Sequence, residues 1–236
     1  MHLLKHTAKA VAASIMLSAA VTGCRAPATR PASIPGTEST SAAAPTVATR
    51  YRIDGAASSL HILVYRAGAL ARLGHNHVVS SSKVSGFVAV DPILAKSHVQ
   101  IILPVASVVV DDADARRLEG EDFSAEVPLE ARESTRSNLL RAEILDVARY
   151  PEISLQSVRV SGLHAAPSLV MRVKLKDVER EVTVPVQMSY GTKNLTATGE
   201  FQLKQTDFGI TPFSAGLGAL QVRDTLVIKF RIVARA

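Results

Sequence analysis

The sequence predicts a mainly β protein whose antiparallel strands form a barrel or a sandwich. Several segments alternate apolar and polar residues with period two, which is typical of half-buried strands. Turn-like segments separate them at hairpin-scale intervals, and only one stretch shows helical spacing. A barrel or a sandwich would limit the exposed strand edges that such a sheet would otherwise present. Alternation by itself does not choose between these two architectures.

The composition is that of a globular domain without a nucleic-acid surface. Of 236 residues, 47% are hydrophobic and 20% are charged, which allows a packed core. Aromatic residues make up 4% and Trp is absent, which argues against stacking on bases. The net charge of +6 is scattered along the chain, so we expect no nucleic-acid partner and a solvated or membrane-facing basic surface.

The first 23 residues predict a signal peptide. Lys5 and Lys9 give a basic start, and an apolar run of about a dozen residues follows from Ala10 to Val21. A membrane-spanning helix needs about 20 residues, so this run is too short to span a bilayer. It ends in Val-Thr-Gly-Cys24, which resembles the bacterial lipobox and predicts lipidation of Cys24.

Cys24 is the only cysteine of the sequence, which excludes an intrachain disulfide and a cysteine-based metal site. Stable anchoring takes more than one acyl chain, and lipidated bacterial cysteines normally carry several. Arg25 stands where an Asp would indicate retention in the inner membrane. We therefore expect a protein of the cell envelope, anchored in the outer membrane and facing the periplasm.

Residues 24–49 combine this cysteine with a predicted tether. Ala, Pro, Ser and Thr dominate the segment and no apolar periodicity is present. A flexible chain of this length reaches about 25–30 Å. The folded domain is predicted to cover residues 50–236 and to begin near Tyr51.

Alternation or apolar character marks the expected strands, and a hairpin turn is expected at Lys176–Arg180. In chain order they are Ser58–Tyr65, Phe87–Val90, His98–Leu103, Glu152–Val160, Leu169–Leu175, Val182–Met188, Phe201–Leu203 and Leu226–Val233.

One helical excursion is predicted at Glu133–Val147, because Leu139, Leu140, Ile144 and Val147 share helical spacing. Ser134 or Thr135 would cap its start, and Tyr150-Pro151 would end it. Residues 111–132 are expected to be loop-like, with a short helical turn at 113–119. The acidic run that begins at Asp111 lacks the glycine and final Glu of a calcium loop and predicts a solvated turn.

Three segments resemble the YceI-like family in the order in which that family has them. They are Tyr51–Asp54 followed by Ser58–Val64, the stretch Asn138–Ser157 (NLLRAEILDVARYPEISLQS), and Phe201–Ile210 (FQLKQTDFGI). The resemblance implies a single lipocalin-like antiparallel β-barrel whose lumen takes a long isoprenoid, such as a polyprenyl diphosphate or a quinone tail. Most members are soluble periplasmic proteins, whereas this chain carries the predicted anchor. Gly74-His-Asn-His77 resembles a subset of the family.

Two strands are apolar on both faces, which is compatible with an oily lumen or with a filled core. Leu60, Ile62 and Val64 alternate with His61, Leu63 and Tyr65, and Val105–Val110 is mostly apolar. A barrel wall of this kind packs a helix outside and leaves apolar side chains facing inward.

Histidines are the candidates for polar chemistry. His75 and His77 are two residues apart, so in a strand both rings would face one side, as in some metal sites. His61 is a third ligand-binding candidate and one of several conceivable further metal ligands. The alternatives are ordinary hydrogen bonding to backbone or water and contact with a polar head group.

The run Ile210–Gln221 predicts a mobile loop at the barrel mouth. Phe208, Phe213 and Leu217 would form an apolar lip there, or would be buried. No nucleophile–base arrangement is evident, so an enzyme is not predicted. Three functions remain open: a non-catalytic carrier of an isoprenoid-type lipid, a metal-binding protein or metalloenzyme that uses His75 and His77, and a structural lipoprotein with a filled barrel. The carrier needs no cofactor beyond its lipid. The oligomeric state is not predicted, and a dimer is compatible with the sequence.

Overall fold

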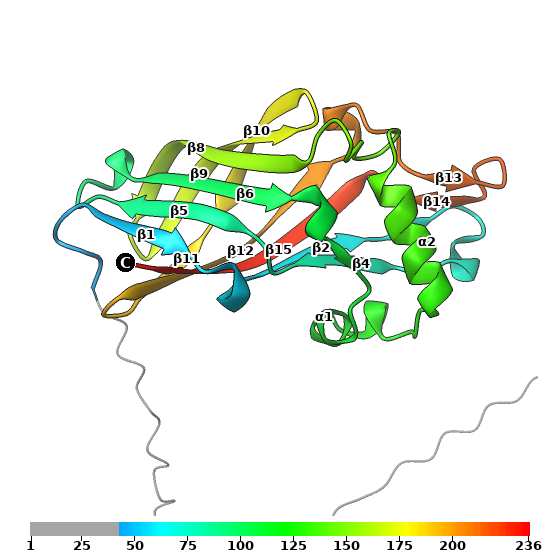
Figure 1. Ribbon diagram of the computed structural model, residues 1–236, viewed down its shortest axis with the longest axis horizontal. Helices are drawn as coiled ribbons and strands as arrows, with labels where there is room; N and C mark the ends of the chain where they lie inside the picture. The colour runs from blue at the N-terminus through cyan, green and yellow to red at the C-terminus, as the bar shows by residue number, and fades with distance from the viewer. Residues whose placement is uncertain (1–42) are drawn as a thin grey trace, which may run out of the picture. The chain divides into compact units, whose positions relative to one another are not determined.

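The computed structural model describes residues 43–236, which are built mainly from strands (Figure 1). The strands are β1 (Thr49–Ile53), β2 (Ser59–Val64), β3 (Arg66–Ala67), β4 (His77–Ser81), β5 (Ser85–Val90), β6 (His98–Pro104), β7 (Val109–Val110), β8 (Glu152–Leu163), β9 (Ala166–Leu175), β10 (Val178–Pro185), β11 (Gln187–Tyr190), β12 (Asn194–Lys204), β13 (Ser214–Ala215), β14 (Leu220–Val222) and β15 (Thr225–Arg235). The helices are α1 (Ala113–Leu118), α2 (Leu129–Leu140) and the short 3-10 turns η1 (Gly55–Ala57), η2 (Ala71–Leu73), η3 (Leu94–Lys96), η4 (Val105–Ser107), η5 (Glu121–Phe123) and η6 (Thr206–Phe208).

A 12-stranded antiparallel sheet is organised around the long strand β15 (Figure 1). β15 pairs with β12 along one edge, and with β2 and then β1 along the other. From β1 the sheet continues through β5, β6, β8 and β9 to β10, and from β2 it continues through β4 to β7. Most of the strands predicted by alternation are confirmed by this sheet. The expected strand Val182–Met188 is instead divided between β10 and β11, and the expected turn at Lys176–Arg180 is shorter, because β10 already begins at Val178. The apolar run Val105–Val110 forms η4 and the two-residue β7 rather than one strand.

The two ends of the sheet meet at one end of the barrel, around Pro185. β10 pairs with β9 up to Pro185, and β11 then pairs with β12. Proline has no N–H to donate to a neighbouring strand, and at Pro185 the chain stops pairing with β9 and goes on to pair with β12. Two backbone hydrogen bonds join the following segment to the other edge: Val186 N–H donates to Pro167 O (3.0 Å) and Met188 N–H to Ala165 O (2.8 Å). These bonds close the circumference only at this end, because β10 and β12 form no ladder with each other.

At the opposite end no ladder between the described strands closes the sheet, and this end carries α2. It is called the wide end below, and the end at Pro185 is called the narrow end. Arg136 on this helix donates from Nε to the Val108 carbonyl (3.0 Å) and from Nη2 to the Ala106 carbonyl (2.7 Å). Leu139 and Leu140 at the end of α2 pack on core clusters formed by β7, β9 and their neighbours. The helix is thus fixed beside the open end of the sheet.

The predicted bounds of this helix are wrong at both ends. α2 begins after Pro128, whose missing N–H removes no helical hydrogen bond at that position. It ends at Leu140 because Arg141 is extended (ψ 165°), and Asp146 takes a left-handed conformation (φ 47°) in the turns that follow. Ile144 and Leu145 therefore join the core from a turn rather than from a helix.

The expected loop at 210–221 is also wrong, since the segment forms the hairpin β13–β14. β14 pairs with β3, which completes a separate three-stranded sheet beside the wide end (Figure 1). The predicted signal peptide, Cys24 and all but the last residues of the tether lie outside the described residues. No helix of the described part is both long and apolar enough to cross a membrane.

Candidate functional site

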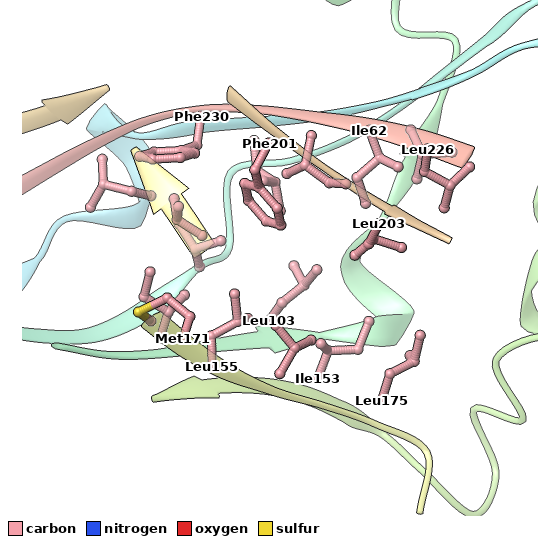
Figure 2. A pocket seen from close by; sticks show the side chains of 18 of the residues that line it. Ile62, Leu103, Ile153, Leu155, Met171, Leu175, Phe201, Leu203, Leu226 and Phe230 are labelled. Atoms are coloured by element: carbon pink, nitrogen blue, oxygen red, sulfur yellow. The ribbon is translucent and has the colours of Figure 1, made fainter. Parts of the chain in front are cut away.

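A cavity of about 360 Å³ lies inside the barrel. Figure 2 shows two of its walls: Phe201, Phe230 and Leu226 project from β12 and β15, and Leu155 and Met171 project toward them from β8 and β9. The volume falls within the range of about 300–1,000 Å³ typical of small-molecule sites. The interior is therefore not filled by side chains along its whole length.

The alternation of the strands explains why the lining is apolar. Every second residue of a strand faces the same side, and on β2 these residues are Leu60, Ile62 and Val64. The same rule brings Leu169, Met171, Val173 and Leu175 of β9 to the cavity, together with alternate residues of β5, β6, β12 and β15. A site with this lining recognises an apolar chain by excluding water rather than by hydrogen bonds.

Polar side chains reach the cavity at a few positions. Three of them, His77, Thr135 and Asn138, belong to β4 and α2 at the wide end, and Gln205 precedes η6 at the same end. Tyr190 of β11 and Ser97, directly before β6, line the narrow end. Both are already bonded to the backbone there, since the Tyr190 hydroxyl donates to the carbonyl of His164 (3.2 Å) and the Ser97 hydroxyl accepts from the N–H of Asp91 (3.0 Å). The wide end is thus the more polar end of an otherwise apolar lumen.

The ring of His77 is held in place by the carboxylate of Asp111. Its Nδ1 lies 2.6 Å from Oδ2 of Asp111, whose side chain is fully buried. Asp111 Oδ1 also accepts from the backbone N–H of Val78 (2.9 Å) and from Arg116 (2.5 Å). Burial raises the pKa of Asp111, but the bonds from His77, Val78 and Arg116 outweigh it, and the pKa lies below its ordinary value.

The prediction of a solvated acidic turn is wrong for Asp111. The apolar run that precedes Asp111 ends in the buried Val110, and Asp111, the next residue, is buried as well. Arg116 comes from α1, one helical turn further along, and donates as well to the Asn76 carbonyl (2.7 Å). Neither partner is visible as a motif. The only hint in the sequence is an acidic residue placed directly after an apolar run.

His61 lies on the other side of the barrel wall from the cavity. On β2 it alternates with the lining residues, and its Nδ1 is 2.5 Å from Oε1 of Glu119, which follows α1. Lys229 of β15 contacts the second oxygen of Glu119 at 2.8 Å. Burial raises the pKa of Glu119, but the bonds from Lys229 and His61 outweigh it and leave the pKa below its ordinary value. His61 therefore fixes α1 to the sheet.

His75 and His77 do not share a strand face as predicted, because β4 begins only at His77. Their ring centroids are 6.3 Å apart and His75 is not a lining residue of the cavity. Within residues 43–236, no group of three His, Cys, Asp or Glu side chains has the arrangement needed to hold a metal ion. The arrangement that the structure does show for His77 is the pair with Asp111.

The three residues of the expected apolar lip are separated by the fold. Phe208 is buried in a core cluster with Val105 and Leu145 and is not itself a lining residue of the cavity. Phe213 lines the cavity while 46% exposed, which places it at the cavity opening. Leu217 is fully exposed at the tip of the β13–β14 hairpin and does not line the cavity.

The fold was compared with those of solved structures. The crystal structure of Burkholderia cenocepacia BcnA is 19% identical with a TM-score of 0.57, over 77% of this chain and 99% of BcnA. A Campylobacter jejuni YCEI protein is 11% identical with a TM-score of 0.49, over 67% of this chain and 84% of its own. No curated protein matches the sequence. At these identities, the likeness to BcnA shows the fold, which is an antiparallel lipocalin-like barrel.

The family model of the YceI-like domain matches residues 51–234, which span nearly all of the part that the structure describes. This match agrees with the three segments that resemble the family in the sequence. The chain therefore belongs to the YceI-like family.

Proposed function

We propose that this protein is a non-catalytic carrier that holds an apolar, isoprenoid-type lipid, a polyprenyl chain or a quinone tail, in the lumen of its barrel. The observation that carries the proposal is the apolar cavity inside the sheet. Each Å² of apolar surface removed from water contributes about 25 cal/mol, so a chain that fills such a lumen binds mainly by burial. The chain belongs to the YceI-like family. Resemblance to that family implies an isoprenoid ligand, which supports this ligand class.

The distribution of polar groups supports one orientation of the ligand. The tail would lie toward Ala197 and Tyr190, and the head group toward His77 at the wide end. Since Nδ1 of His77 is occupied by Asp111, a neutral His77 would donate from Nδ1 and offer Nε2 as an acceptor. Nε2 is then suited to a hydroxyl on the ligand, and a protonated ring to a carbonyl or phosphate oxygen.

The carrier is proposed to act in the cell envelope, tied to a membrane by a lipidated Cys24 and facing the periplasm from the outer membrane. Support for this part comes from the sequence, namely the short apolar run, the lipobox-like Val-Thr-Gly-Cys24 and Arg25. Mass spectrometry of the membrane-extracted protein tests it: the mature chain should start at an acylated Cys24. An unmodified Cys24 or an uncleaved first segment would refute the anchor.

The lipid is tested by native mass spectrometry and organic extraction of protein purified from membranes. We expect a co-purifying prenyl lipid at near-stoichiometric amounts, and uptake of an added prenyl quinone by protein that has been stripped of lipid. Protein that is repeatedly empty and takes up no quinone would refute the carrier function.

A further inference from the structure

An apolar patch stands on the two loops that border the wide end of the barrel. It consists of Leu70, Leu73, Phe213 and Leu217, which are 39%, 65%, 46% and 110% exposed. Below, these four residues are called the rim patch. Isolated exposed apolar residues are ordinary, but a cluster beside a cavity opening indicates an interaction surface.

Backbone contacts hold the two loops together as one unit. β14 of one loop pairs with β3 of the other, and Leu70 N–H donates to the Ala219 carbonyl (2.8 Å). Figure 1 shows the hairpin β13–β14 and the β3 segment at the same end of the domain, away from the C-terminus. Phe213 belongs both to the rim patch and to the cavity lining, so the patch is continuous with the opening.

The hairpin tip holds a leucine in a conformation that leucine rarely adopts. Leu217 has φ 55° between Gly216 and Gly218, which also have positive φ values. A bulky residue in the left-handed region costs free energy, and full exposure gives it no packing in return. The stability of the domain does not explain a leucine at this position, whereas contact with an apolar partner does.

The charge around the rim patch selects the partner. Residues 65–77 and 209–223 include Arg66, Arg72 and Arg223 but no Asp or Glu. The acidic residues next to these ranges are Asp207 and Asp224, and the carboxylate of Asp224 accepts from the backbone N–H and the hydroxyl of Thr206. Arg72 is exposed next to Leu73, and Arg223 is exposed beside the ring of Tyr65 (5.3 Å). Apolar side chains flanked by arginines are typical of surfaces that insert into the interface of an anionic membrane.

We propose that the rim patch docks the domain on an anionic lipid bilayer, with Leu217 and Phe213 inserted among the lipids and the arginines against the head groups. This proposal rests on the proposed carrier function, because docking brings the cavity opening to the level from which a membrane lipid would enter. The ligand would then pass between bilayer and lumen without crossing water.

The test uses residues 43–236, so that the predicted anchor does not contribute. This part holds all the described core clusters, and BcnA matches it with 99% of its own length. Sedimentation with vesicles of phosphatidylglycerol and phosphatidylcholine is compared with sedimentation with phosphatidylcholine alone. We expect clear binding to the anionic vesicles and little to the neutral ones.

Two matched pairs of variants assign the binding to the rim patch. Leu217→Asn should lower the partition coefficient about tenfold, whereas Leu163→Asn, at the exposed β8–β9 turn of the narrow end, should leave it within about twofold. Asn tolerates the left-handed region, so Leu217→Asn should fold. Arg72→Gln should lower binding about fivefold, and Arg52→Gln on β1 should not.

Three results would overturn the docking proposal: no binding of the wild type to anionic vesicles, equal losses in Leu217→Asn and Leu163→Asn, or a wild-type dimer that Leu217→Asn converts to a monomer in light scattering. Uptake of a short-chain prenyl quinone without vesicles separates the two proposals. If the protein takes up the quinone but does not bind vesicles, only the docking proposal is refuted. If it binds vesicles but takes up no quinone, only the carrier function is refuted.

Discussion

His77 and Asp111 lie side by side at the wide end of the barrel, with Nδ1 2.6 Å from Oδ2. The contact links a cavity-lining side chain to a fully buried carboxylate that also binds Arg116. The orientation of the ring at the cavity therefore depends on a charge network that belongs to the core of the domain.

Removal of Asp111 should be strongly destabilising. Asp111→Ala leaves the buried Arg116 without its counter-charge, and breaking a buried pair from one side costs about 3–5 kcal/mol. Urea unfolding of residues 43–236 measures the change. The matched control is Asp114→Ala on α1, because Asp114 forms an exposed pair with Arg117 and should contribute less than about 1 kcal/mol. Equal losses in both variants would contradict the buried network.

The dependence of stability on pH should report Glu119. Its pKa in the folded domain is below the ordinary value of 4.5, so the unfolded chain binds more protons as the pH falls below about 5. The stabilisation is therefore complete above 4.5 and is lost as the pH falls toward the folded-state pKa. The free energy of unfolding of the wild type should decline between pH 5 and 3.

Glu119→Gln separates this contribution from those of other carboxylates. The variant should be less stable than the wild type at pH 7, and the difference should narrow as the pH falls to 3. Glu133→Gln, at an exposed position of α2, is the control for loss of one acidic residue. A difference between wild type and Glu119→Gln that stays constant from pH 7 to 3 would argue against a lowered pKa.

Gly199 is the first residue of β12 beyond its pairing with β11, and it should not tolerate a side chain. A Cβ at this position would lie 2.4 Å from the Pro185 carbonyl oxygen and 2.6 Å from the ring of Phe230. Gly199→Ala should therefore destabilise the domain by about 1–3 kcal/mol, because the Pro185 carbonyl belongs to the backbone and cannot move aside without shifting the strand. Thermal and urea unfolding measure the effect. Glu200→Ala, at the exposed next position, should change stability by less than about 0.5 kcal/mol.

The strands were predictable from the sequence because their signal is local. Each alternating segment, such as Leu169–Leu175, fixes which side chains face the lumen without reference to the rest of the chain. The apolar character of both faces of β2 likewise indicated that the wall separates two apolar regions. His75 and His77 could both be selected as candidates, but the sequence did not show that β4 begins only at His77 and leaves His75 outside the strand.

The features that the sequence did not predict depend on contacts between distant segments. The burial of Asp111 depends on Arg116 and on the backbone of Val78, which no spacing rule connects to it. The sequence left open whether Phe208 is buried or forms part of a lip, because its burial depends on the turns after α2, where a helix was expected as far as Val147. The tip at Leu217 is defined by pairing of β14 with β3, two strands too short to show a pattern.

Enlarging a side chain that faces the lumen distinguishes a hollow barrel from a filled one. Leu155 of β8 points into the cavity (Figure 2), whereas Val158 on the same strand is 43% exposed. In a filled core, Leu155→Trp would be overpacked and cost about 1–3 kcal/mol. In this cavity the larger ring has room, so we expect a melting temperature no lower than that of the wild type and a clear loss of prenyl quinone uptake. Val158→Trp should leave both quantities unchanged. If Leu155→Trp destabilises the domain while uptake persists, the ligand does not occupy this part of the lumen.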